Sequence, residues 1–191
     1  MNSPHALLYI AIQQLIQSIT GDDDQPIFRF IEYDFGQFEN YVPPGKPAVS
    51  FPAALISIED ADYTNMQAKG QLGNIRVQLR LGFDPYSATS NLTPDQYRNK
   101  ALQFFENEQA TYVALHGTAP ATATVTASPL TTADLSDIFG YLMRTKAYTE
   151  KRQDFLHVRV ITFNISHNDW SATTPITYTT ADPVITYELQ S

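Results

Sequence analysis

The chain of 191 residues contains no cysteine, and this absence excludes several kinds of chemistry. Structural disulfides, thiolate nucleophiles and cysteine-ligated zinc all require a residue that is missing here. Glycine is also scarce, because only eight are spread along the chain, and neither a phosphate-binding glycine pattern nor the G-x-S-x-G turn of serine hydrolases occurs. We therefore expect a protein that is not an enzyme and that carries no cofactor.

The chain also has few basic residues. Twelve Lys and Arg stand against twenty Asp and Glu, which gives a formal charge of −8. Wrapping nucleic acid requires clustered Lys and Arg, so this balance argues against DNA or RNA binding by charge neutralisation. No apolar run approaches the ~18 residues of a membrane span, and the first residues lack the basic region of a signal peptide. The sequence predicts a soluble protein that stays in the compartment where it is made.

Metal-binding patterns are missing too. The four histidines lack the i, i+4 spacing of a helical metal pair; they are His5, His116, His157 and His167. The acidic run Asp22–Asp24 has no calcium-loop glycine after it, so we expect a solvated turn there and no metal site.

Hydrophobic periodicity predicts two main helices. The first begins at Ser3–Pro4, which suits an N-cap followed by proline, and extends to residue 19. The second begins at a capping box, Thr93–Gln96, and ends near His116–Gly117. Each has an apolar stripe at helical spacing. The stripes are Leu8, Ile12, Leu15, Ile16 and Ile19 in the first helix, and Tyr97, Ala101, Phe104, Phe105, Tyr112 and Leu115 in the second.

Several segments predict strands, at Ile27–Tyr33, Ala53–Glu59 and Asn74–Phe83. The last alternates strictly between apolar and polar residues, which indicates a sheet with one buried and one wet face. The polar connection Asp60–Gly73 is a candidate hairpin tip. We expect an α+β fold, with two helices packed on an antiparallel sheet of about four or five strands. Residues 1–170 form this domain, and residues 171–191 form a C-terminal extension or hairpin.

An unusually long strand is predicted at Asp154–Asn168, and its apolar positions change parity halfway. Val158 and Val160 lie on one side, whereas Ile161 and Phe163 lie on the other. Either a β-bulge near Val160 restores the phase, or the two halves face different partners. About 15 residues span roughly 50 Å, more than a compact domain of this size needs. Such a strand favours a subunit of an assembly.

Candidate contacts with other subunits or partners gather on this strand and in the Thr-rich tail. They are aromatic or basic residues that suit an interface, namely Phe155, His157, Arg159, Trp170, Tyr178 and Tyr187. The tail is able to add a strand to a neighbour's sheet or to fold back on its own domain. Trp170 either anchors a partner or closes the core.

The order of elements resembles that of the tail terminator, or tail completion, proteins of tailed bacteriophages. An N-terminal helix, an aromatic strand, a Pro-rich loop and a sheet precede a second helix and the long strand. The resemblance covers roughly residues 3–170. It rests on this order of elements and on the general residue pattern of two stretches, Tyr33–Gln37 and Phe155–Trp170. The Pro-rich and Thr/Ala-rich segments have no counterpart in the simplest members, which leaves another neck or baseplate role open.

This resemblance implies a structural virion protein that assembles as a ring, usually of six subunits, and has no catalytic residues. The ring caps the tail tube and joins it to the head–tail connector or neck protein, at the neck end of the virion tail. Assembly takes place in the host bacterial cytoplasm, without a membrane. DNA passes through without specific binding, and an acidic subunit would keep the duplex mobile by repelling its phosphates.

A binding module is the alternative to an assembly protein. Aromatic and acidic residues on loops suit the recognition of a carbohydrate or a divalent cation. The cleft would be built from Tyr33, Tyr41, Asp60, Asp62 and Trp170.

Overall fold

The computed structural model describes residues 3–21, 23–39, 49–66, 70–84, 90–120, 135, 138–152 and 156–169. Two α-helices and five strands make up this part of the chain, together with a short 3₁₀ turn at Gln37–Glu39. In order they are α1 (Pro4–Gln17), β1 (Phe30–Tyr33), β2 (Ala53–Asn65), β3 (Gln71–Phe83), α2 (Asp95–Leu115), β4 (Met143–Thr149) and β5 (His157–Asp169).

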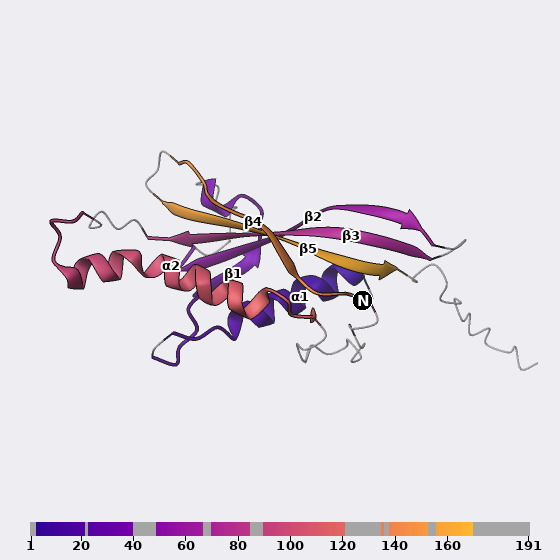
Figure 1. Cartoon of the computed structure of the whole chain (residues 1–191), viewed down its shortest axis with the longest axis horizontal. Coiled ribbons are helices and arrows are strands. Elements are labelled where there is room, and N and C mark those ends of the chain that lie inside the picture. The colour runs from indigo at the N-terminus through magenta and orange to yellow at the C-terminus, as the bar shows by residue number, and fades with distance from the viewer. Residues whose placement is uncertain are drawn as a thin grey trace, which may run out of the picture.

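The strands form one sheet in the order β1-β2-β3-β5-β4. Every neighbouring pair is antiparallel except β1 with β2, which run parallel. Both helices lie on the same side of the sheet (Figure 1). The predicted α+β class, with two helices on a mainly antiparallel sheet, is confirmed. The predicted C-terminal extension, 171–191, lies outside the described residues.

The helices occur where periodicity predicts them, but their ends differ in detail. Ser3 is the N-cap of α1 with proline next, yet its hydroxyl makes no capping hydrogen bond, and the helix ends at Gln17 instead of at residue 19. The predicted capping box of α2 does not form, because Pro94 takes the N-cap position and has no side chain that caps. Packing of an apolar face therefore stabilises these helices more than capping does.

Strands β2 and β3 are longer than their sequences predict. The polar connection at Asp60–Gly73 is largely strand, because the hairpin continues to Asn65 on one side and resumes at Gln71 on the other. A register shift between Ile58 and Ala61 accommodates one extra residue in β2. Alternation fades here because the end of the hairpin leaves the core and no longer has a buried face.

The apolar residues in the two halves of β5 lie on opposite faces of the sheet, which explains why their parity changes along the strand. The strand pairs with β3 along all 13 residues without a register shift, so no bulge is present in that ladder. Val158 and Val160 pack on one face, and Ile161, Phe163 and Ile165 pack on the other. The two halves therefore bury their apolar residues against different layers, as the second alternative predicts. The register shift on this side of the sheet belongs to β4, between Arg144 and Lys146.

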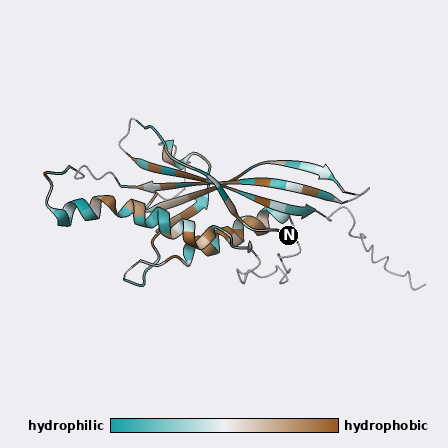
Figure 2. Cartoon of the chain, in the orientation of Figure 1, coloured by the Kyte–Doolittle hydropathy of each residue, from teal (hydrophilic) through white to brown (hydrophobic). Residues whose placement is uncertain are grey.

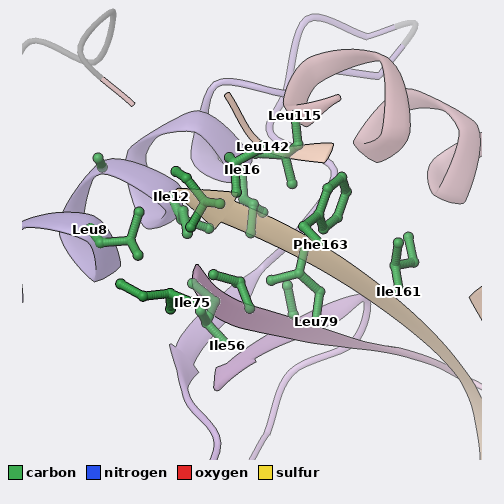
Figure 3. Close-up of a cluster of buried hydrophobic side chains, with 14 of the residues drawn as sticks. Leu8, Ile12, Ile16, Ile56, Ile75, Leu79, Leu115, Leu142, Ile161 and Phe163 are labelled. Carbon is green, nitrogen blue, oxygen red and sulfur yellow. The ribbon is translucent and has the colours of Figure 1, made fainter. Parts of the chain in front are cut away.

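The main core fills the space between the sheet and the two helices. Figure 3 shows Leu8, Ile12 and Ile16 of α1 directed toward the sheet. They meet apolar residues from β2, β3 and β5, among them Ile56, Leu79 and Phe163, which are fully buried. Figure 2 shows the corresponding alternation of hydrophobic and hydrophilic residues along the strands. The alternation of β3 thus gives the sheet its buried and its wet side, as predicted.

A second, smaller cluster lies on the opposite face of the sheet, at one end only. It consists of buried apolar residues, which are Phe38, Ala53, Leu55, Val158 and Val160. Phe38 approaches β3 so closely that a Cβ on Gly82 would collide with its ring. Glycine is therefore required at this position, because the covering segment presses directly on the backbone.

Candidate functional site

A partly buried ion network lies beside the second cluster: Arg80, Asp34 and Arg152 are nearly buried, whereas Glu39 is about half exposed. The guanidinium of Arg80 lies 3.1 Å from Asp34 and 3.0 Å from Glu150, and it also pairs with Glu39. Arg152 joins through Glu39 and donates a hydrogen bond to the carbonyl of Phe38. The network therefore ties two chain segments, 34–39 and 150–152, to the sheet face at Arg80.

The charges in this network are strongly coupled. Hydrogen bonding from Arg80 is the main reason that the pKa of Glu39 lies below its usual value. Burial alone would lower the pKa of Arg80, but the bonds to Glu39 and Glu150 and the charge of Asp34 outweigh that effect and raise it. Both groups are therefore ionised at neutral pH, and the network is structural in character, because it links elements of one chain.

Two residues expected at an interface, His157 and Arg159, instead contact α2. Arg159 makes two hydrogen bonds of 2.7 Å to Glu108, and both side chains are nearly buried. His157 packs against Phe104 with 4.0 Å between the ring centres. These contacts lie within the chain, so they do not support a direct role in partner binding. That role stays a prediction for both residues.

The other four expected interface residues lie outside the described residues: Phe155, Trp170, Tyr178 and Tyr187. Sequence inspection missed Glu108, because an acid in the middle of a helix usually faces solvent. The buried face of α2 runs through Ala101, Phe104, Glu108, Thr111 and Leu115 at alternating spacings of three and four. Tyr97 and Phe105, expected in the apolar stripe, are more than half exposed.

A buried histidine, His167, lies toward the far end of β5. Its ring is 1% exposed, and neither nitrogen has a hydrogen-bond partner among the described residues. Phe139 stacks on it at 5.1 Å, and the rings of Tyr63 and His5 lie 6.2 and 6.1 Å away. Burial lowers its pKa, and His5 lowers it further, although Asp169 opposes them.

Stability is expected to fall when pH drops below about 6.5, because the unfolded chain then binds a proton that folded His167 resists. In His167→Phe, the free energy of unfolding should depend less on pH between 7 and 5.5, by at most about 1.4 kcal/mol per pH unit. Urea unfolding across this range measures the slope. His116→Phe, at a half-buried helix end, is the control. Equal slopes for wild type and His167→Phe would contradict the prediction.

A wide groove of about 1560 Å³ lies between α1, α2 and the adjacent ends of the strands. Its lining is mixed, with Gln13 and Gln17 on one side, Phe104 and Asn107 on another, and His157 at the strand end. The Nε2 atom of His157 is buried without a hydrogen-bond partner among the described residues. Burial is the main cause of its lowered pKa. The groove therefore offers a neutral imidazole beside aromatic and amide groups.

The cleft expected for the binding module does not form from the residues proposed for it. Tyr33 pairs with Ile56 and contacts Tyr9 of α1, so it lies on the helix side of the sheet. Asp62 pairs with Asn74 and lies on the opposite side, near the end of the hairpin. These two residues cannot share one cleft. Tyr41 and Trp170 lie outside the described residues, as does the side chain of Asp60.

The end of the β2–β3 hairpin reaches beyond both helices (Figure 1). Residues 62–66 and 71–72 are exposed, and three of them are large and apolar. Tyr63, Met66 and Leu72 are 40%, 51% and 42% exposed. Between Tyr63 and Ile75 the sequence has one charged residue, Lys69, which lies outside the described residues. A tip with several exposed apolar side chains and few charges is typical of an interaction surface.

The described residues hold no grouping of three or more His, Asp or Glu side chains that would suit a metal ion. Neither described helix has the length and hydropathy that crossing a bilayer requires. Comparison of the chain with models of known protein families gives no match, and comparison with curated proteins finds no significant similarity.

Proposed function

We propose that this protein is a structural subunit of a phage-like tail, which assembles into a ring that caps the tail tube and meets the head-side connector. The observation that carries the proposal is the hairpin tip with exposed Tyr63, Met66 and Leu72. Met66 and Leu72 gain little from standing in water, whereas burial at a subunit contact would stabilise an assembly; Tyr63, which also contacts His167, lies at the same end of the hairpin.

The form of the contact favours a ring over a symmetric pair. The tip projects beyond both helices (Figure 1), which suits contact with a different surface of the next subunit, and such heterologous contacts form a ring when the rotation between subunits closes. The net charge of −8 suits a ring around DNA, because acidic walls repel phosphates. Ring number and position on the tube follow from the resemblance to tail terminators.

Light scattering of the purified full-length chain, with negative-stain images of the same peak, tests the proposal. We expect closed rings of several subunits, or rings that form when tail tubes are added. A monodisperse monomer that also fails to bind tail tubes would contradict it.

The double variant Met66→Ser/Leu72→Ser should weaken subunit association by about 3 kcal/mol, or roughly 100-fold in affinity, because two apolar side chains are lost from the contact. The melting temperature of the isolated subunit should barely change, since both side chains are already exposed. Concentration-dependent light scattering measures the affinity. Leu92→Ser is the matched control, because Leu92 is 88% exposed before α2 and away from the tip. Equal weakening by both variants would contradict a specific role of the tip.

The groove beside His157 favours a second candidate function, a ligand-binding module. A panel of sugars and divalent cations would raise the melting temperature if the groove binds one of them. For a purely structural ring subunit we expect a flat response. A stabilising ligand whose effect disappears in Asn107→Leu, which alters the groove lining, would favour the binding module.

A further inference from the structure

The outer strand of the sheet, β4, presents an open edge. All seven of its residues are exposed, and among the described strands only β5 pairs with it. Its beginning is covered, because the backbone N–H of Arg144 donates to His116 and that of Leu142 donates to Thr118. The open stretch therefore starts after Arg144 and ends at Thr149. An edge of this kind is a template for another strand.

The hydrogen-bond pattern between β4 and β5 determines which backbone N–H and C=O groups of β4 point away from the sheet. The N–H of Glu150 donates to the carbonyl of Val158, so this opposed pair is hydrogen-bonded. Opposed pairs alternate along an antiparallel ladder, which turns the N–H and C=O groups of Ala147 and Thr149 away from β5. An added strand would bind at these two residues.

The charge of β4 identifies the kind of strand that fits. Arg144 and Lys146 are its only charged residues, in a chain whose overall charge is −8. The last 22 residues, 170–191, contain Asp182 and Glu188 but neither Lys nor Arg. This segment is therefore complementary in charge to the open edge.

The pattern of the same segment suits a strand. Within Val184–Leu189, apolar Ile185, Tyr187 and Leu189 alternate with Thr186 and Glu188. β-branched and aromatic residues with a period of two are typical of strands. A strand added to the edge of a sheet gains its affinity from backbone hydrogen bonds and its specificity from such alternate side chains.

The chain leaves the sheet far from its own open edge. Asp169, at the end of β5, pairs with Gln71 at the hairpin tip, whereas Thr149 is opposite Arg159, ten residues back along β5. This separation is roughly 33 Å. The 14 residues between Asp169 and Val184 extend to roughly 50 Å, which is long enough to reach this edge or the same edge of a neighbouring subunit; the proposed ring favours the neighbour.

We propose that Val184–Leu189 of one copy pairs with β4 of the next copy in the ring. The inference rests on the proposed ring and names one of its contacts. Each copy gives a tail and receives one, so the contact is heterologous and repeats around a closed ring. Burial of the Ala147 and Thr149 backbone groups removes the exposed edge of every subunit.

Amide exchange of the full-length ring, followed by mass spectrometry, tests the pairing. Residues 145–149 should exchange at least about tenfold more slowly in the wild type than in the double variant Ile185→Pro/Tyr187→Pro, because proline cannot pair in a ladder. Ser171→Pro is the control, because it lies outside the pairing segment, and should exchange like the wild type. Unchanged exchange in the double variant, with rings still present, would overturn the pairing and leave the proposed function standing.

Cysteine pairs distinguish a neighbour's tail from the subunit's own. The chain has no native cysteine, so a variant with Thr149→Cys and another with Tyr187→Cys report only the engineered contact. After mixing and mild oxidation, a disulfide between the two different chains supports pairing with a neighbour. In the double variant carrying both cysteines, a disulfide found only within one chain would overturn it. A wild-type chain that never forms rings, alone or on tail tubes, would overturn both this inference and the proposed function.

Discussion

Phe163→Ala is expected to lower the free energy of unfolding by about 4 kcal/mol, the largest effect of any single substitution proposed for this chain. Phe163 is 0% exposed on β5, between Val77 of β3 and Arg144 of β4 in the ladder. Figure 3 places it among Leu79, Leu115 and Leu142. Removing the ring leaves a cavity between the sheet and the helices, which the surrounding strands are too constrained to fill.

Urea unfolding measures this loss, and Phe105→Ala is the matched control. Phe105 has the same side chain but is 51% exposed on α2, so we expect a loss below about 1 kcal/mol there. If both variants lose similar stability, the burial of Phe163 is not what stabilises the sheet. A large loss for Phe163→Ala together with lost rings would show that assembly depends on this core.

Arg80→Met is expected to cost about 3 kcal/mol, because it leaves the carboxylates of Asp34, Glu39 and Glu150 with Arg152 as the cation that remains in the network. The Arg80 and Asp34 side chains are only 11% and 12% exposed, so water compensates poorly for the lost partner. Removing one member of a buried pair is costly in a way that removing an exposed charge is not.

Arg76→Met provides the control on the same strand and the same face. Arg76 lies 3.6 Å from Glu59 and is 57% exposed, so we expect a change below about 1 kcal/mol. Urea unfolding at neutral pH compares the two variants. A double variant, Arg80→Met/Asp34→Leu, should recover part of the loss, because it removes the buried acid that Arg80 neutralises. Equal costs for Arg80→Met and Arg76→Met would refute a special role for the buried network.

Phe163 and Arg80 are both expected to stabilise the sheet on which the proposed contacts depend. The hairpin tip lies at the end of this sheet and β4 at its edge, and only the beginning of β4 contacts a helix. Their positions are therefore held by strand pairing and by the layers on both faces. A rigid sheet with exposed ends is suited to a subunit that places the same two surfaces repeatedly around a ring.

The amino-acid sequence by itself determined the helices, the central strand and the α+β class. The stripe from Leu8 to Ile16 and the alternation in β3 involve residues only two to four positions apart, so local geometry suffices to recognise them. The absence of cysteine and of catalytic motifs was equally visible without a structure.

Only the tertiary structure decided which faces of the long strand are covered and which polar residues are buried. Glu108 is buried because Arg159, 51 residues away in the chain, lies opposite it. Val160 is buried because Phe38 packs in the same cluster on the far side of the sheet. The open edge of β4 depends on which strand pairs with which. Such contacts join residues that are distant in sequence, and a local pattern of hydrophobicity does not identify the partner of each residue.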